Sequence, residues 1–297
     1  MLFRSGAEYA TSDYREIIND PDIDLVVAAT RHNMAPVIAS EALRARKHVH
    51  VEKPLAIDLD GLRAVAAAAG ASQAMLSVGF NRRSTPAMRA AYDCFRGRTT
   101  PLAMHCRVNA GFIPAGHWVH DPVEGGGRIL GEVCHFVDLL HFFAASPPIR
   151  VHAARLTPDG GSVLGDDNVA ATLEFADGSV GTLLYSALGP GALPKERVEI
   201  LGAGRGAVID NFRSVELYRG ADRKAISGRQ DKGYRAEFEA FVSAVVSGDP
   251  APIPVRELLL STLATLCIEE SLRTGNSVPV DLDAALAPLE EPPAGRP

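Results

Sequence analysis

Residues 47–56 read KHVHVEKPLA, and this is the most informative segment of the chain. A short strand is expected over residues 48–51, and the Glu52-Lys53 pair follows where that strand ends. Pro54 fixes the turn and prevents a helix from starting at once. Because α/β enzymes hold their ligands at the carboxyl ends of parallel strands, Lys53 is placed to orient a hydroxyl, stabilise an alkoxide or act as a base. Taken alone, the stretch fits equally well a surface lysine beside an exposed glutamate.

The flanking sequence extends this pattern into a parallel sheet. The run LVVAAT at 25–30 predicts a buried strand, and a further strand is expected over 73–78. Helices are expected over 14–19, 36–46 and 58–69, the last of them capped by Asp58. Strands that alternate with helices predict βαβ units, with a ligand crevice at the carboxyl edge of the sheet.

The pattern changes after about residue 100. Gly125-Gly126-Gly127 is expected to open a helix that runs to about Ala144, and two amphipathic helices are expected over 234–246 and 255–273. The other segments predict short strands, at 104–108, 149–156, 169–175, 180–186, 197–201, 207–210 and 215–218. The predicted fold class is therefore α/β followed by α+β. Residues 1–95 form an incomplete Rossmann-type parallel sheet domain, residues 96–280 form a domain with a mostly antiparallel sheet, and residues 281–297 form a flexible tail.

The beginning of the chain differs from a complete nucleotide-binding domain. Such a domain starts with a strand, a Gly-rich turn and a helix N-terminus that holds the pyrophosphate. Nothing of that kind precedes Leu25. The GAGRG run at 202–206 lies between two predicted strands and is interpreted as a hairpin turn. We therefore expect an N-terminally truncated chain that lacks its first phosphate-binding βαβ unit.

The composition of the chain argues against several classes of partner. The net charge is -6 and the isoelectric point is about 5.9, which gives no general attraction to nucleic acid or to an anionic membrane. No apolar run reaches the roughly 20 residues that span a bilayer, and the start lacks the apolar run of a signal peptide. The four cysteines are scattered without CxxC pairs, which predicts buried reduced thiols. We expect a cytoplasmic protein with neither nucleic acid nor membrane as a partner.

Taken in order, the motifs resemble the glucose–fructose oxidoreductase/inositol dehydrogenase/MocA family. They are the strand at 26–30, the EKPLA run at 52–56, GFNRR at 79–83 and the segment from Gly125 to His135. The resemblance implies a Rossmann domain plus a domain with an open sheet, through which relatives often form homo-oligomers. It also implies hydride transfer between NAD or NADP and a hydroxyl-bearing carbon of a sugar, nucleotide sugar or cyclitol.

The resemblance assigns roles to individual residues. Lys53 matches the lysine that contacts the reacting hydroxyl, and His135 matches the histidine that acts as acid/base or hydrogen-bonds the substrate. An ordinary imidazole pKa suits proton exchange near neutral pH. The residues expected at the cofactor are Thr30, Arg31, Glu52, Lys53, Pro54, Asn81 and Arg82.

The segment HWVHD at 117–121 is interpreted as a loop that lines the substrate cleft. Two imidazoles and a carboxylate also suit a metal ion, but Pro114, Gly116 and Pro122 favour a loop, and no metal site is predicted. Trp118 is expected to stack on a sugar face and His120 to bond hydroxyls. Arg128 is expected to bind an anionic substrate group, and a surface salt bridge is the equal alternative.

Besides the missing first βαβ unit, two departures from the family pattern leave other functions possible. Gly131 stands where relatives carry an aspartate four residues before the histidine, and Ala35 stands where many relatives carry a histidine. Glu132 is expected at the substrate, either replacing that acid or interacting with the helix dipole. A non-catalytic sugar- or nucleotide-binding relative and an inactive truncated module are the alternatives. The sequence of residues 125–138 resembles a subgroup in which this module is the C-terminal half of a two-part oxidoreductase. That resemblance implies an alcohol-dehydrogenase-like half upstream.

Overall fold

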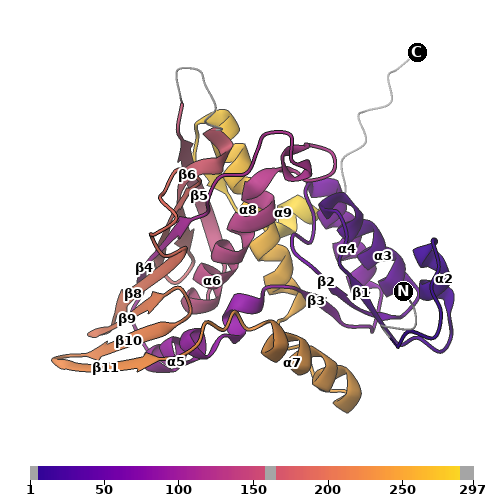
Figure 1. The fold of residues 1–297 in the computed structure, drawn as a ribbon, viewed down its shortest axis with the longest axis horizontal. Helices are drawn as coiled ribbons and strands as arrows, with labels where there is room; N and C mark the ends of the chain where they lie inside the picture. The colour runs from indigo at the N-terminus through magenta and orange to yellow at the C-terminus, as the bar shows by residue number, and fades with distance from the viewer. Residues whose placement is uncertain (1–5, 158–164, 288–297) are drawn as a thin grey trace.

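The computed structural model describes residues 6–157 and 165–287, and its N-terminal half contains a parallel sheet (Figure 1). The strands β1 (Leu25–Ala28), β2 (His48–Val51) and β3 (Leu76–Val78) lie in that order. The helices of this half are α2 (Tyr14–Asn19), α3 (Ala35–Arg44) and α4 (Leu59–Gly70). All of these elements were predicted, and the Asp58 side chain accepts a hydrogen bond from the Gly61 amide at the start of α4. The carboxyl ends of the three strands lie at one edge of the sheet.

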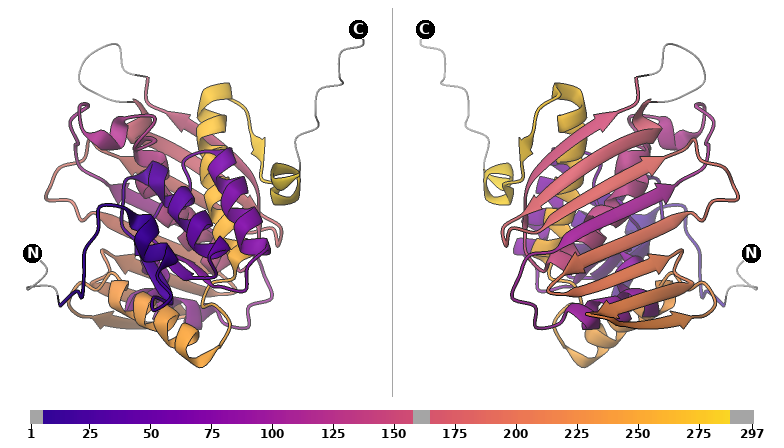
Figure 2. Two further views of the ribbon diagram at one scale, coloured as in Figure 1. Left: turned by 90° about the vertical axis from the view of Figure 1, so that its right-hand side faces the viewer. Right: turned by 90° about the vertical axis from the view of Figure 1, so that its left-hand side faces the viewer.

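A second sheet of nine strands forms the other half within the described residues. Its order is β11-β10-β9-β8-β4-β7-β6-β5-β12, and only β4 and β7 run parallel to each other. Figure 2 shows helices against one face of this sheet and none against the other. The strands are β4 (Ala103–Asn109), β5 (Pro148–Arg155), β6 (Asn168–Phe175), β7 (Val180–Ser186), β8 (Glu196–Gly202), β9 (Arg205–Asp210), β10 (Ser214–Arg219), β11 (Asp222–Ser227) and β12 (Val278–Pro279).

The covered face of this sheet carries the core. On β7 the side chains of Leu183 and Tyr185 are buried, whereas Val180 and Leu184 on the other face are exposed, as the two-residue repeat of a strand requires. Helices α5 (Pro86–Phe95), α6 (Cys134–Ala144) and α8 (Val255–Thr274) supply the opposing layer (Figure 1). Helix α7 (Tyr234–Ser247) instead packs against His50 of β2 through Phe238 and Phe241. Because α8 contacts both β3 and β5, it joins the two sheets. No helix within residues 6–157 and 165–287 is long and apolar enough to cross a bilayer.

Several expectations about individual elements need correction. The prediction of a tail from residue 281 is wrong up to residue 287, because α9 (Leu282–Leu286) is capped by the Asp281 side chain and packs against α4. Residues 288–297 lie outside the described residues. Helix α5 was not predicted, although Thr85 caps it and Pro86 occupies its first position. The strand β11 was also not predicted, because every residue in it is exposed and no apolar alternation marks it.

Helix α7 buries a carboxyl group beside the parallel sheet. Glu237 is 8% exposed, and its Oε1 has no hydrogen-bond partner within the described residues. Burial, and then the charge of Glu52, raise the pKa of Glu237 to about 8. This carboxyl therefore keeps its proton at neutral pH in the folded chain, where the unfolded chain has already lost it. Stability should fall as the pH rises from the ordinary value of about 4.5 towards about 8.

Glu237→Gln removes this titration while keeping the shape of the side chain. We expect the variant to gain stability over the wild type across that interval, reaching roughly 1–3 kcal/mol near pH 9. Urea unfolding at several pH values measures the difference. Glu239→Gln on the same helix is the control, because Glu239 is exposed and paired with Arg235. A Glu237→Gln effect that does not depend on pH would show that the buried carboxyl does not titrate as described.

Candidate active site

Turns from three strands meet at the carboxyl edge of the parallel sheet. Residues 29–32 follow β1, Glu52 and Lys53 follow β2, and Gly79 follows β3. A Cβ atom at Gly79 would lie 2.8 Å from Oε2 of Glu52, so the glycine lets the second and third turns approach closely. The peptide bond between Lys53 and Pro54 is cis. This edge is the predicted ligand crevice.

Lys53 connects this edge to the second half of the chain. Its side chain is half-buried, and Nζ donates a hydrogen bond of 2.7 Å to the carbonyl oxygen of Gly131. Gly131 lies in a π-helical turn, Ile129–Val133, that leads directly into α6. Single π-helical turns are frequent at functional sites. The sequence predicted a helix here without this irregular first turn.

His135 lies one helical turn after Gly131, on the same side of the helix. It is 4% exposed, and its Nδ1 has no hydrogen-bond partner within the described residues. The ring of Phe80 lies edge-on at 6.4 Å. Burial and the nearby charges of Arg82 and Lys53 hold the pKa of His135 well below its ordinary value. The expectation of an ordinary imidazole pKa is therefore wrong, and His135 is neutral at pH 7.

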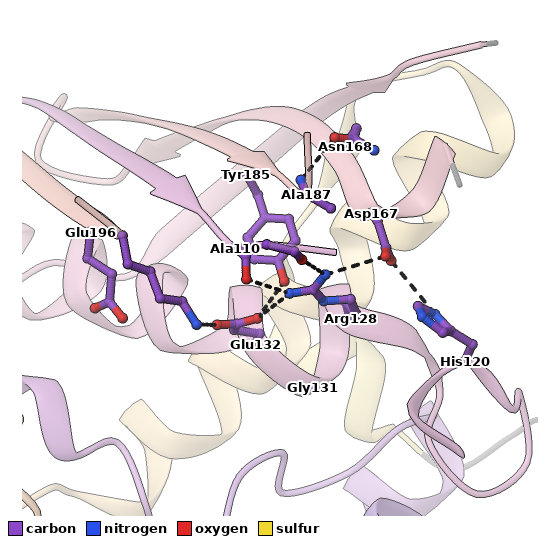
Figure 3. A network of polar contacts seen from close by, with 12 residues as sticks. Ala110, His120, Arg128, Gly131, Glu132, Asp167, Asn168, Tyr185, Ala187 and Glu196 are labelled. Carbon is purple, nitrogen blue, oxygen red and sulfur yellow. Dashed lines mark hydrogen bonds and ion pairs between the residues drawn. The ribbon is translucent and has the colours of Figure 1, made fainter. Parts of the chain in front are cut away.

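Glu132 is the centre of a polar network on the other side of the π-helical turn (Figure 3). Its carboxylate pairs with Nη2 of Arg128 at 3.1 Å and with Nζ of Lys195 at 2.5 Å. It also accepts a hydrogen bond from the hydroxyl of Tyr185. Against the effect of burial, Lys195, Tyr185 and Arg128 lower the pKa of Glu132 to about 2. Glu132 is therefore a fixed anion, and it is not free to exchange protons near neutral pH.

Arg128 lies inside this network. It is 2% exposed and donates to the carbonyl oxygens of Gly111 and Ala110 as well as to Glu132. Its second carboxylate partner is Asp167, at 3.4 Å, which in turn lies 3.7 Å from Nδ1 of His120. The expectations of an open anion site and of a surface salt bridge are both wrong for Arg128, because the residue is buried and both of its terminal nitrogens, Nη1 and Nη2, bind internal partners. Nε2 of His120 is buried without a hydrogen-bond partner within the described residues.

Arg82 and Asn81 also make internal contacts. Arg82 binds Glu196 on β8 with two hydrogen bonds, of 3.0 and 2.9 Å, and both side chains are buried. Lys232 adds a second cation, 3.1 Å from the same carboxylate. Asn81 is fully buried and donates to the carbonyl oxygen of Lys232. These contacts connect the turn after β3 to strand β8 of the second sheet.

Trp118 lies against the turn that follows β1. The guanidinium of Arg31 lies 4.5 Å from the centre of its ring, and the ring of His32 meets it edge-on at 4.8 Å. Arg31 also pairs with Glu124 at 3.0 Å. The loop with Trp118 thus covers the first turn of the crevice, as a substrate loop would. Within the described residues, no group of three His, Cys, Asp or Glu side chains has the arrangement of a metal site.

His32 is the residue that sequence reasoning missed. Its Nδ1 lies 2.6 Å from the carbonyl oxygen of Gly125, and its ring fills the space beside Gly131. The available signal was the missing side chain at 131, but only the fold brings residues 32 and 131 together. The position of Ala35, by contrast, is buried in α3.

A nicotinamide dinucleotide fits the chemistry of this edge. Polar groups of two neighbouring turns converge there, and the buried Nδ1 of His135 remains unpartnered within residues 6–157 and 165–287. The residues that would hold the cofactor are Thr30, Arg31, Glu52, Lys53 and Pro54. The positions of Asn81 and Arg82 favour a supporting role, since both side chains face internal partners.

Two family models match the chain. One, described as "Oxidoreductase family, NAD-binding Rossmann fold", matches residues 4–80, and the other, described as "GFO/IDH/MocA C-terminal domain", matches residues 99–207. Together they cover well over half of the chain. They confirm the predicted class of fold and the nicotinamide cofactor. They do not support the prediction of a missing first phosphate-binding unit, because the Rossmann model matches from residue 4 onward.

Curated relatives and solved structures agree with these matches. The chain is 26% identical to the "Uncharacterized oxidoreductase YrbE" of Bacillus subtilis (strain 168), over 92% of this chain and 83% of that protein. It is 24% identical to the myo-inositol 2-dehydrogenase of Thermotoga maritima, over 95% and 87% of the two chains. A structure of levoglucosan dehydrogenase in complex with NADH and levoglucosan superimposes with a TM-score of 0.81 at 24% identity, over 94% of this chain and 86% of that chain. The last likeness shows the shared fold.

Proposed function

Because the chain belongs to the GFO/IDH/MocA family of NAD-binding oxidoreductases, we propose that it transfers hydride between a nicotinamide and a hydroxyl-bearing carbon of a sugar, nucleotide sugar or cyclitol. One observation carries this proposal. Lys53, from the end of a parallel strand, reaches the turn that begins the helix of His135, so a cation and a neutral imidazole lie at one point of the crevice. The names of relatives that act on inositol and levoglucosan support this substrate class.

Lys53 and His135 have different roles at the substrate hydroxyl. The ammonium of Lys53 polarises the hydroxyl and stabilises negative charge on its oxygen as the C–H bond breaks. His135, held neutral by burial, orients the same hydroxyl through a hydrogen bond. A bound nicotinamide supplies the hydride acceptor or donor.

The network around Glu132 shapes the rest of the substrate pocket. We propose that Trp118 and His120 touch the sugar, whereas Arg128 positions Glu132 from behind. The internal contacts of Arg128 support this division. Lys195 is partly exposed and held by Glu132, which suits a donor to substrate hydroxyls.

A homo-oligomer and a cytoplasmic location belong to the same proposal. One face of the nine-stranded sheet is uncovered (Figure 2). Apolar side chains are exposed on this face, among them Leu184 and Leu201. Light scattering after size-exclusion chromatography should give a mass above that of one chain, and a purely monomeric mass would contradict the proposed assembly. The four cysteines are free thiols, which suits a reducing compartment. That an alcohol-dehydrogenase-like half lies upstream stays a prediction.

A non-catalytic binding protein is the competing function, and the observation that favours it is Gly131, where no acid is present. Turnover distinguishes the two. The chain is incubated with NAD⁺ or NADP⁺ and a panel of polyols that includes myo-inositol and levoglucosan, and reduced nicotinamide is followed by absorbance. Polyol-dependent reduction supports the dehydrogenase, whereas cofactor and polyol binding without reduction supports the binding protein.

A further inference from the structure

The space beside Gly131 is filled by a side chain from the opposite half of the crevice. A Cβ atom on Gly131 would lie 2.7 Å from Cε1 of His32, closer than side-chain atoms approach one another. Even an alanine at 131 would therefore displace the ring. Glycine at this position is what allows the imidazole of His32 to lie against the π-helical turn.

His32 is held there in one orientation. The carbonyl oxygen of Gly125 only accepts hydrogen bonds, so Nδ1 of His32, 2.6 Å away, carries the proton. The edge contact with Trp118 fixes the ring from a second side. This tautomer leaves the lone pair of the ring on Nε2, because the hydrogen bond to Gly125 is made through Nδ1. The His32 ring is thus held in one orientation, with Nε2 able to accept a proton from a ligand.

The ring of His32 lies beside the turn that also contacts the two residues assigned to the hydroxyl. Gly131 receives the Lys53 ammonium on its carbonyl oxygen and the His32 ring against its Cα, and His135 follows one turn later. Lys53 is close enough to both rings that its charge lowers the pKa of His32 and of His135. The three side chains therefore lie near one another around the Gly131 turn, at the carboxyl edge of the sheet.

The two histidines differ in their ability to take a proton. Burial, and then the charges of Arg82 and Lys53, hold the pKa of His135 well below its ordinary value. Burial also lowers the pKa of His32, but the hydrogen bond to Gly125 favours its charged form. The imidazolium of His32 would thus be the less costly of the two.

We propose that His32 is a catalytic residue whose Nε2 accepts the substrate hydroxyl proton, in a position that Gly131 opens. This inference rests on the proposed dehydrogenase function. As the substrate C–H bond breaks, its electron pair passes to C4 of the nicotinamide of NAD(P)⁺. The O–H bond breaks, its proton goes to Nε2, and the remaining electron pair forms the C=O bond. The His32 imidazolium then releases its proton to water.

The kinetic test compares His32→Ala and His32→Asn with the wild type, using NAD⁺ or NADP⁺ and myo-inositol or levoglucosan. We expect kcat to fall by about 10²- to 10³-fold with KM changed only a few-fold, loss of the acidic limb of the kcat–pH profile, and partial rescue of His32→Ala by added imidazole. Gly131→Ala, which keeps the histidine but displaces its ring, should lose at least about tenfold. His152→Ala, at an exposed position of β5, is the control and should leave kcat unchanged. An unchanged kcat and pH profile in both His32 variants would overturn the proposal.

A second readout does not depend on turnover. In ¹⁵N-histidine NMR spectra of the full chain, the proposal predicts an Nδ1–H tautomer for His32 and a shift of its Nε2 resonance when NADH and myo-inositol are added. An Nε2–H tautomer, or an Nε2 resonance that ignores both ligands while they bind, would overturn it. If Lys53→Met abolishes turnover and His32→Ala does not, the role of His32 fails while the dehydrogenase function stands. If NADH does not bind at all, the dehydrogenase function itself fails.

Discussion

Lys53→Met should lower the kcat for polyol oxidation by about 10³-fold while leaving NADH affinity within a few-fold of the wild type. The side chain of methionine has nearly the same length, but it can neither donate a hydrogen bond to the hydroxyl nor stabilise negative charge on its oxygen. It also loses the bond to the Gly131 carbonyl, which joins the turn after β2 to the start of α6. Steady-state kinetics with calorimetric NADH titration separate the two effects.

Lys47→Met is the matched control, because Lys47 lies at the other end of strand β2. Lys47 precedes β2, and its Nζ donates to the carbonyl oxygen of Asp20, away from the carboxyl edge. We expect its kcat to stay within about twofold of the wild type. Equal losses in the two variants would point to general damage of the parallel sheet, and an active Lys53→Met enzyme would contradict the assignment of the site.

Arg83→Met should destabilise the folded chain by about 3–5 kcal/mol. Arg83 is buried and binds both oxygens of Asp138, at 2.7 and 2.6 Å, and Oε2 of Glu257 at 2.7 Å. These contacts join the turn after β3 to α6 and α8. Without the arginine, Asp138 would remain buried with only the hydroxyl of Ser261 as a partner. Urea unfolding measures the loss, which should shrink at acidic pH as Asp138 takes up a proton.

The double variant Arg83→Met/Asp138→Leu tests the cause of that loss. Removing both charges leaves no unpaired ion in the core, so the double variant should be more stable than Arg83→Met alone. A double variant that is less stable would mean that packing by the long arginine side chain, and not the stranded carboxylate, accounts for the cost.

Much of the fold follows from local sequence. The strand β2 and the strand β7 have the predicted bounds, and the cap at Asp58 and the hairpin turn at 202–206 are where the sequence places them. Such features depend on neighbours within a few residues, so periodicity and turn chemistry suffice. The same reasoning missed α5 and β11, where the apolar signal is weak.

The site was harder to predict because its decisive contacts are distant in sequence. Arg82 was assigned to a ligand from the family resemblance and Arg128 from its residue type, and both bind carboxylates, those of Glu196 and Glu132. The sequence alone does not distinguish an arginine that binds a buried carboxylate from one that binds a ligand, because the partner residue is distant in the sequence. The pairing of His32 with Gly131 spans the two halves of the chain, and its only trace in the sequence is an absent side chain.

Calorimetric titration of NADH and NADPH into the full chain shows whether the protein binds a nicotinamide cofactor. We expect saturable binding of at least one of them at a single class of sites, with competition by the oxidised form of the same cofactor. We also expect binding to persist in Lys53→Met, since that residue acts on the hydroxyl. No heat of binding with either cofactor up to millimolar concentration would contradict the assignment of a nicotinamide-dependent oxidoreductase.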